Sequence, residues 1–179
     1  LFGKNTTAGN FNVTTKKASF TPGANFEMSY GNYGFIQAKA SITGPIAKTL
    51  AARISFSGTQ RDGLLYNVVS QQKVNDLNNL GVRGQLLYVP SEHVKFTLIG
   101  DFTEQRPNGY AQVFAGVVPT LRASYRQFEN IIKDLNYTLP SRNPFDRLID
   151  TDTQWRSNQD LGGLSLNADR FAAACAVAG

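Results

Sequence analysis

Five segments between about residues 24 and 103 alternate apolar and polar side chains with a period of two. In the third, LAARISFS (residues 50–57), Leu, Ala, Ile and Phe alternate with Ala, Arg, Ser and Ser. This period is that of a β-strand with one apolar face. A sixth segment, LGGLSLNAD (residues 161–169), resumes the pattern after a long interruption. The sequence therefore predicts an all-β chain of about six antiparallel strands.

The length of the segments and of their connections points to a membrane. Each segment runs for about 9 to 12 residues, more than the five or six of a typical soluble strand and close to the length that crosses a bilayer at a tilt. Apart from a tight first hairpin at residues 31–34, short connections at residues 44–49 and 90–93 alternate with long polar ones near 61–80 and 104–158. Outer-membrane barrels alternate short periplasmic turns with long outer loops in the same way. We therefore expect an antiparallel transmembrane β-barrel fragment.

The polar side of each segment is predicted to face a hydrated lumen. The candidate lumen-facing residues are Gln37, Lys39, Arg53 and Arg83. A soluble β-sandwich remains an alternative, because its strands alternate in the same way.

Charge and composition indicate neither a nucleic-acid partner nor a cofactor. The net charge is +5, but the basic residues are scattered and form no stripe interleaved with aromatic residues. His93 and Cys175 are single residues far apart, which does not favour a metal site. Asp150 and Asp152 could suggest a hydrolase, but they lie in a polar stretch without a cleft signal. We expect no enzymatic activity.

The opening stretch, LFGKNTTAGNFNVTTKK (residues 1–17), contains Gly, Lys and Thr but does not fit a P-loop. Asn5 stands where the motif needs Ser or Thr, and a β-prone segment follows instead of a helix. The stretch resembles the end of the plug domain of TonB-dependent outer-membrane receptors, although Asn10 and Phe11 replace the usual Gly and Ile. The residues that match this motif are Phe2, Gly3, Ala8, Gly9, Asn12, Thr15 and Lys16.

This resemblance implies a barrel of about 22 strands whose lumen is closed by a plug. Residues 1–18 would be the C-terminal end of the plug domain, and residues 19–179 the N-terminal part of the barrel, so the chain is expected to be a fragment. The implied setting is the outer membrane of a Gram-negative cell, in contact with its lipid. The implied function is active uptake of a ferric siderophore, cobalamin or glycan, energised by TonB through an N-terminal segment that this chain lacks. A passive porin or structural barrel is an alternative.

The second long insertion is the predicted place of ligand contact, since outer loops of such a receptor would meet the ligand first. Its Arg side chains can pair with carboxylates, and its aromatic rings can stack on sugars or catecholates. An amphipathic helix is expected near residues 121–135. The candidate ligand-contacting residues are Tyr110, Phe114, Arg122, Tyr125, Arg126, Trp155 and Arg156.

Overall fold

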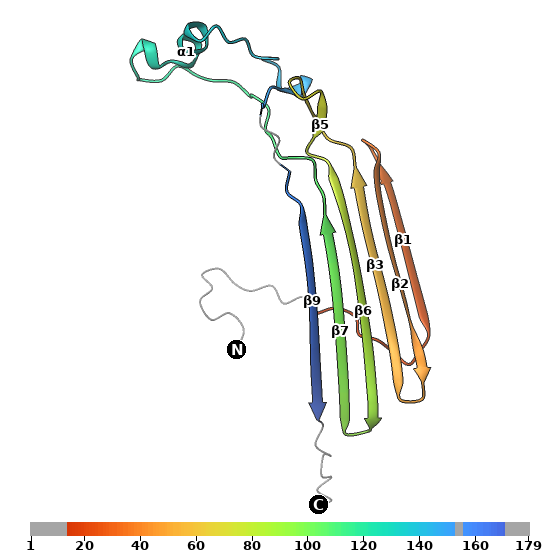
Figure 1. Ribbon diagram of the computed structural model, residues 1–179. Coiled ribbons are helices and arrows are strands. Elements are labelled where there is room, and N and C mark those ends of the chain that lie inside the picture. The colour runs from red at the N-terminus through yellow and green to blue at the C-terminus, as the bar shows by residue number, and fades with distance from the viewer. Residues whose placement is uncertain (1–13, 153–155, 171–179) are drawn as a thin grey trace, which may run out of the picture.

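The computed structural model describes residues 14–152 and 156–170. Six long strands form one antiparallel sheet in the order β1-β2-β3-β6-β7-β9, and β1 and β9 are its two open edges (Figure 1). The strands are β1 (Gly23–Gly31), β2 (Phe35–Ala47), β3 (Leu50–Arg61), β6 (Leu77–Ser91), β7 (Val94–Gln105) and β9 (Gln159–Arg170). The predicted all-β, antiparallel class is confirmed.

A second, smaller sheet lies in the insertions at one end of the large sheet (Figure 1). It has the order β5-β4-β8, and β8 joins β4 in parallel. The second insertion also holds one short α-helix between two 3₁₀ turns. The bounds are β4 (Leu65–Asn67), β5 (Gln72–Val74), η1 (Ser124–Arg126), α1 (Phe128–Asp134), η2 (Pro144–Asp146) and β8 (Leu148–Ile149).

The connections differ in detail from their sequence-based bounds. Because β6 begins at Leu77, the first long insertion covers 62–76 instead of 61–80. The second runs between the end of β7 and the start of β9, at 106–158. The helix expected near 121–135 is broken at Gln127, whose extended backbone (φ −79°, ψ 141°) separates η1 from α1.

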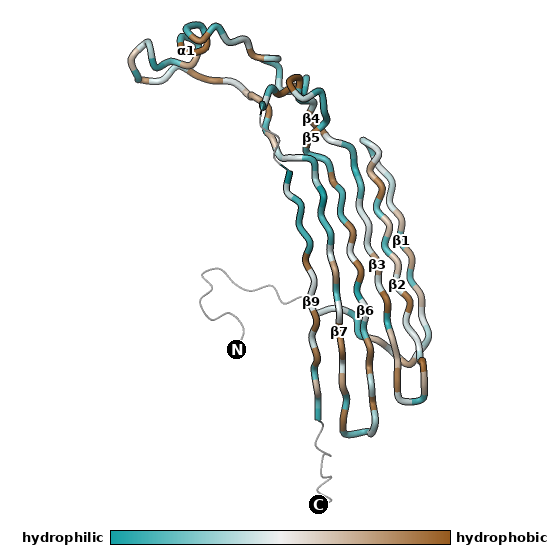
Figure 2. The backbone as a smooth tube through the Cα atoms, viewed as in Figure 1, coloured by the Kyte–Doolittle hydropathy of each residue, from teal (hydrophilic) through white to brown (hydrophobic). Residues whose placement is uncertain are grey.

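The register of the strands sorts the side chains onto two faces. Phe26 of β1, Phe56 of β3 and Phe102 of β7 lie in one row across the sheet with Ala40 and Val82. Since neighbouring residues point to opposite faces, every second residue joins this face. Figure 2 shows hydrophobic segments (brown) along the strands and hydrophilic segments (teal) where β7 and β9 approach the insertions. We call the face that carries these large side chains the apolar face: Phe26, Met28, Ile42, Ile54, Phe56, Val82, Leu86, Phe102, Leu164 and Leu166.

Burial on the two faces is the reverse of that in a soluble sheet. Phe26 is 72% exposed and Leu164 78% exposed on the apolar face, whereas Gln85 and Thr97 on the opposite, polar face are each 4% exposed. In the described ranges only five hydrophobic residues are buried, and no second sheet or helix packs on the apolar face. Folding alone therefore leaves most of the large side chains of the apolar face exposed.

Residues 14–22, here called the N-terminal strap, lie against the polar face near the short turns. Ala18 packs with Ala51 and Leu87, and all three are buried. The Gln85 side chain donates from Nε2 to the Lys16 carbonyl oxygen at 3.0 Å. The strap explains why Leu87 interrupts the polar alternation of its strand, since its side chain is covered by Ala18.

A larger side chain at position 51 should dislodge the strap. Ala51 is 0% exposed, so Ala51→Leu overpacks the contact with Ala18 at a typical cost of about 1–3 kcal/mol. In the full-length protein, we expect trypsin to cleave after Lys16 and Lys17 at least about fivefold faster in this variant than in the unchanged chain. Mass spectrometry of the products measures the two rates. Ala52→Leu, one residue along on the apolar face, is the matched control. Equal cleavage rates in the two variants would contradict this packing.

Candidate functional site

The four residues predicted to face a lumen all lie on the polar face. Gln37 donates from Nε2 to the Thr59 hydroxyl at 3.0 Å. Lys39 lies 3.3 Å from the Glu27 carboxylate, in an exposed pair. Arg53 donates from Nη2 to the Ser41 hydroxyl at 2.9 Å. The face is thus a polar surface with its side chains linked across strands.

Arg83 and Gln85 leave part of this surface with unused hydrogen-bonding capacity. Within the described residues, Arg83 Nε and Gln85 Oε1 are buried without a hydrogen-bond partner. Arg83 lies between Ser55 and Asp101 in the register, and Gln85 donates a hydrogen bond to the strap. A buried donor and a buried acceptor therefore stand beside the place where the N-terminal segment crosses the sheet.

The predicted plug motif is described only at its end. Thr15 and Lys16 belong to the strap. A second anchor of the strap is Ser19, whose backbone N–H donates to the Thr43 hydroxyl at 3.0 Å. The motif residues outside the described ranges are Phe2, Gly3, Ala8, Gly9 and Asn12.

At the opposite end of the sheet, the second insertion is anchored to the first. Asn67 on β4 is 2% exposed and donates from Nδ2 to the Thr151 carbonyl oxygen at 2.6 Å. Arg147 donates to the Tyr33 hydroxyl in the β1–β2 turn, with its guanidinium 5.1 Å from the Tyr33 ring centroid. Asp62 donates its backbone N–H to the Tyr33 carbonyl oxygen at 2.8 Å. Together these contacts hold the second insertion against the first, and both against the ends of β1 to β3.

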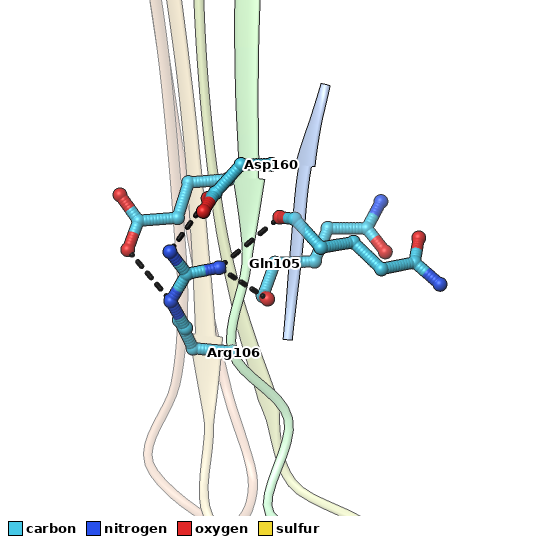
Figure 3. A network of polar contacts seen from close by, with 5 residues as sticks. Gln105, Arg106 and Asp160 are labelled. Carbon is cyan, nitrogen blue, oxygen red and sulfur yellow. Dashed lines mark hydrogen bonds and ion pairs between the residues drawn. The ribbon is translucent and has the colours of Figure 1, made fainter. Parts of the chain in front are cut away.

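Arg106 ties together the two points where the second insertion leaves and rejoins the sheet (Figure 3). Its guanidinium lies 3.1 Å from Glu104 and 2.6 Å from Asp160. The same group donates to the carbonyl oxygens of Gln105 and Gln159, each at 3.1 Å. One cation therefore bridges two carboxylates at the rim of the apolar face.

Two of the predicted ligand-contacting residues, Tyr110 and Arg156, line one pocket of about 460 Å³. The pocket lies where both insertions meet the sheet, and Arg61, Asn75 and Asp76 also line it. These three residues are absent from the sequence-based prediction. Only the Asn-Asp pair, a turn-favouring signal, could have marked the site in the sequence.

The other predicted contacts are not brought to this pocket. Phe114 stacks on Phe128 of α1, with ring centroids 5.2 Å apart. The guanidinium of Arg126 lies 5.5 Å from the ring centroid of Tyr125. Arg122 accepts a hydrogen bond from Gln127 Nε2 at its carbonyl oxygen, at 2.7 Å. These residues organise the outer part of the insertion, and Trp155 lies outside the described residues.

Two ionisable pairs stabilise the outer part of the insertion. Arg142 binds both Glu129 carboxylate oxygens, at 2.8 and 2.7 Å, and this hydrogen bonding lowers the pKa of Glu129 and raises the pKa of Arg142. The Tyr137 hydroxyl donates to Asp150, which raises the pKa of Tyr137. Asp150 thus serves as a hydrogen-bond acceptor within the loop.

Comparisons with protein-family models, with curated proteins and with solved structures returned no match to this chain. Among the described residues, no group of three or more His, Cys, Asp or Glu side chains is arranged to hold a metal ion. The helices in that part of the chain are too short or too polar to span a membrane.

The Glu129 pair gives a pH dependence with a defined sign. Because the folded pKa lies below the ordinary 4.5, the pair stabilises the loop above pH 4.5, and this contribution is lost as the pH falls through the folded pKa. An NMR titration of the Glu129 carboxyl should give a midpoint below 4.5. Arg142→Gln should move the midpoint upward, and Arg142→Lys should move it less. A midpoint that is the same in all three proteins would refute the pairing.

Proposed function

We propose that this chain is part of a TonB-dependent outer-membrane receptor, with the apolar face in lipid and the polar face toward a plugged lumen. The observation that carries the proposal is the uncovered apolar face, which extends over six long strands. Lipid satisfies such a surface without a second protein layer, whereas water does not. The resemblance of residues 1–17 to the end of a plug domain is what favours this receptor family over other outer-membrane barrels.

The height of the apolar band fits a bilayer. On β3 the apolar residues extend from Leu50 to Gly58, a distance of about 27 Å along the strand. At a strand tilt of about 35°, this length projects to about 22 Å along the membrane normal, close to the band of about 25 Å in outer-membrane barrels. A strand of an ordinary soluble sheet would end well short of this.

The outer boundary of the band also supports a barrel, because it steps from strand to strand. On β3 and β6 the polar residues that end the band are Gln60 and Asn78, which pair with each other. On β7 and β9 the charged residues Glu104 and Asp160 come two residues nearer the strand centre. The boundary therefore steps by about 7 Å between the adjacent strands β6 and β7 and runs obliquely to the rows. The tilted strands of a barrel produce an oblique boundary of this kind.

The polar face suits contact with a plug. The strap, which would continue from the plug domain, already lies on this face, and it leaves buried polar atoms of Arg83 and Gln85 beside it. A plug that supplied an acceptor for Arg83 Nε would remove the cost of burying this donor. In this proposal residues 1–18 are the end of the plug domain and residues 19–179 are the start of the barrel.

In this proposal the receptor takes up a bulky, scarce ligand with energy from TonB, and the anchored insertions face the cell exterior. Both insertions lie at the end of the sheet opposite the strap, as a route from outer loops to plug requires (Figure 1). Uptake that survives collapse of the inner-membrane proton gradient would instead indicate a passive barrel.

Spin labels can test the two faces in the full-length protein in its membrane. Nitroxides at Ile54 and Leu98 should be more accessible to oxygen than to a water-soluble nickel chelate, and a label at Ser55 should show the reverse. Cys175→Ser provides the background for single-cysteine labelling. Labels at Ile54 and Leu98 that sense water or a protein layer would reject the proposal.

Loss of Arg53 should loosen the contact between the polar face and a plug. Arg53→Leu removes the guanidinium that binds Ser41 and places an apolar side chain on this face. We expect cells that carry this variant to admit more of a large antibiotic than cells with the unchanged receptor. Lys48→Leu, in the turn between β2 and β3, serves as the control. Equal antibiotic sensitivity in the two variants would argue against a plug on this face.

A further inference from the structure

We propose that the pocket between the two insertions binds a small organic anion with an apolar body, of the aryl carboxylate class. This inference rests on the proposed function, for which it names the chemistry of the ligand group that is held at the outer end of the sheet. It favours an anionic ligand over a neutral glycan.

Hydrogen bonds from both insertions hold the pocket walls in place. The side-chain amide of Asn75 pairs with the backbone of Ala111, accepting from its N–H at 2.7 Å and donating to its carbonyl oxygen at 2.8 Å. Asp76 accepts from the backbone N–H of Asn108, whose side chain donates to the Lys73 carbonyl oxygen at 2.9 Å. The walls are thus formed before a ligand arrives, as in most small-molecule sites.

The charge of the lining favours an anion. Two arginines, Arg61 and Arg156, line the pocket together with one acidic residue, Asp76. Asp76 already accepts a hydrogen bond from the pocket wall. Arg61 donates from Nη2 to the Asn75 carbonyl oxygen at 2.5 Å, but its Nε is buried without a partner within the described residues. A carboxylate in the pocket can instead pair with the positive charge of Arg61 and Arg156 in charge-assisted hydrogen bonds.

The remaining lining sets the shape of the ligand. Leu64, Leu77 and Pro107 give the pocket apolar walls, and Tyr110 adds an aromatic ring that is 72% exposed. An apolar or aromatic body can pack on these groups while its acid reaches the guanidinium. The volume of about 460 Å³ admits a fused two-ring body. A sugar would leave its hydroxyl groups against the apolar walls.

Three probes of one shape and different charge can test the site in the full-length protein in detergent. Isothermal titration should detect saturable binding of 2-naphthoate, with 2-naphthamide and 2-naphthylmethylamine at least about tenfold weaker, because only the acid pairs with Arg61. Empty micelles correct for partitioning of the probes. Failure of 2-naphthoate to saturate up to millimolar concentrations, or an equal Kd for the amide, would overturn the proposal.

Substitutions at the two guanidiniums locate the binding. Arg61→Gln and Arg156→Gln should each raise the Kd of 2-naphthoate about tenfold. Arg156 is exposed, so its replacement tests the site even if Arg61→Gln fails to fold. Lys133→Gln removes an exposed cation of α1 outside the pocket and should leave the Kd unchanged. An unchanged Kd in Arg156→Gln, or an equal loss in Lys133→Gln, would place binding elsewhere or make it nonspecific.

The two proposals fail in different ways. If the spin labels report lipid at Ile54 and Leu98 but no naphthoate binds, the membrane assignment stands and the anion site is wrong. If the labels report water, the receptor proposal falls whatever the probes do.

Discussion

The constraint on which the whole structure depends is the register of the six long strands. Antiparallel pairing fixes which residues stand opposite each other, and the period of two then collects the apolar side chains on one face. A slip of one residue in any strand would send its apolar side chains to the polar face, where the strap and the bridging polar side chains lie. The two faces, the strap contact and the position of the insertions all follow from this one arrangement.

The strands could be predicted from sequence because each has an alternation, with few exceptions, that is longer than any competing pattern. The exceptions could not, because they depend on partners far away in the chain. Leu87 breaks its pattern since Ala18 covers it, and this contact joins segments about 70 residues apart. The break before α1 at Gln127 depends on hydrogen bonds to the Thr120 and Arg122 carbonyl oxygens, which no periodicity announces.

The candidate site was predictable in part. From the sequence, Gln37, Lys39, Arg53 and Arg83 are expected on one face. This follows because side chains along a strand point alternately to the two faces of the sheet. The sequence marked Tyr110 and Arg156 by residue type, but not that they share a pocket with Arg61, whose contribution depends on how the two insertions join. The remaining loop residues were grouped by their position in one long connection, whereas their partners are local, as with Phe114 on Phe128.

The small sheet has a consequence for how the second insertion can change over evolutionary time. The C-terminal part of the second insertion is held by the pairing of β8 with β4 and by the hydrogen bond from Asn67. Its N-terminal part is held by the hydrogen bonds between Asn75 and Ala111. The stretch between these two points of attachment, which contains α1, does not pair with any strand of the large sheet. Lengthening a loop that is already closed costs little entropy. The stretch that contains α1 can therefore be replaced by another sequence while these two contacts, and the large sheet beneath them, stay as they are.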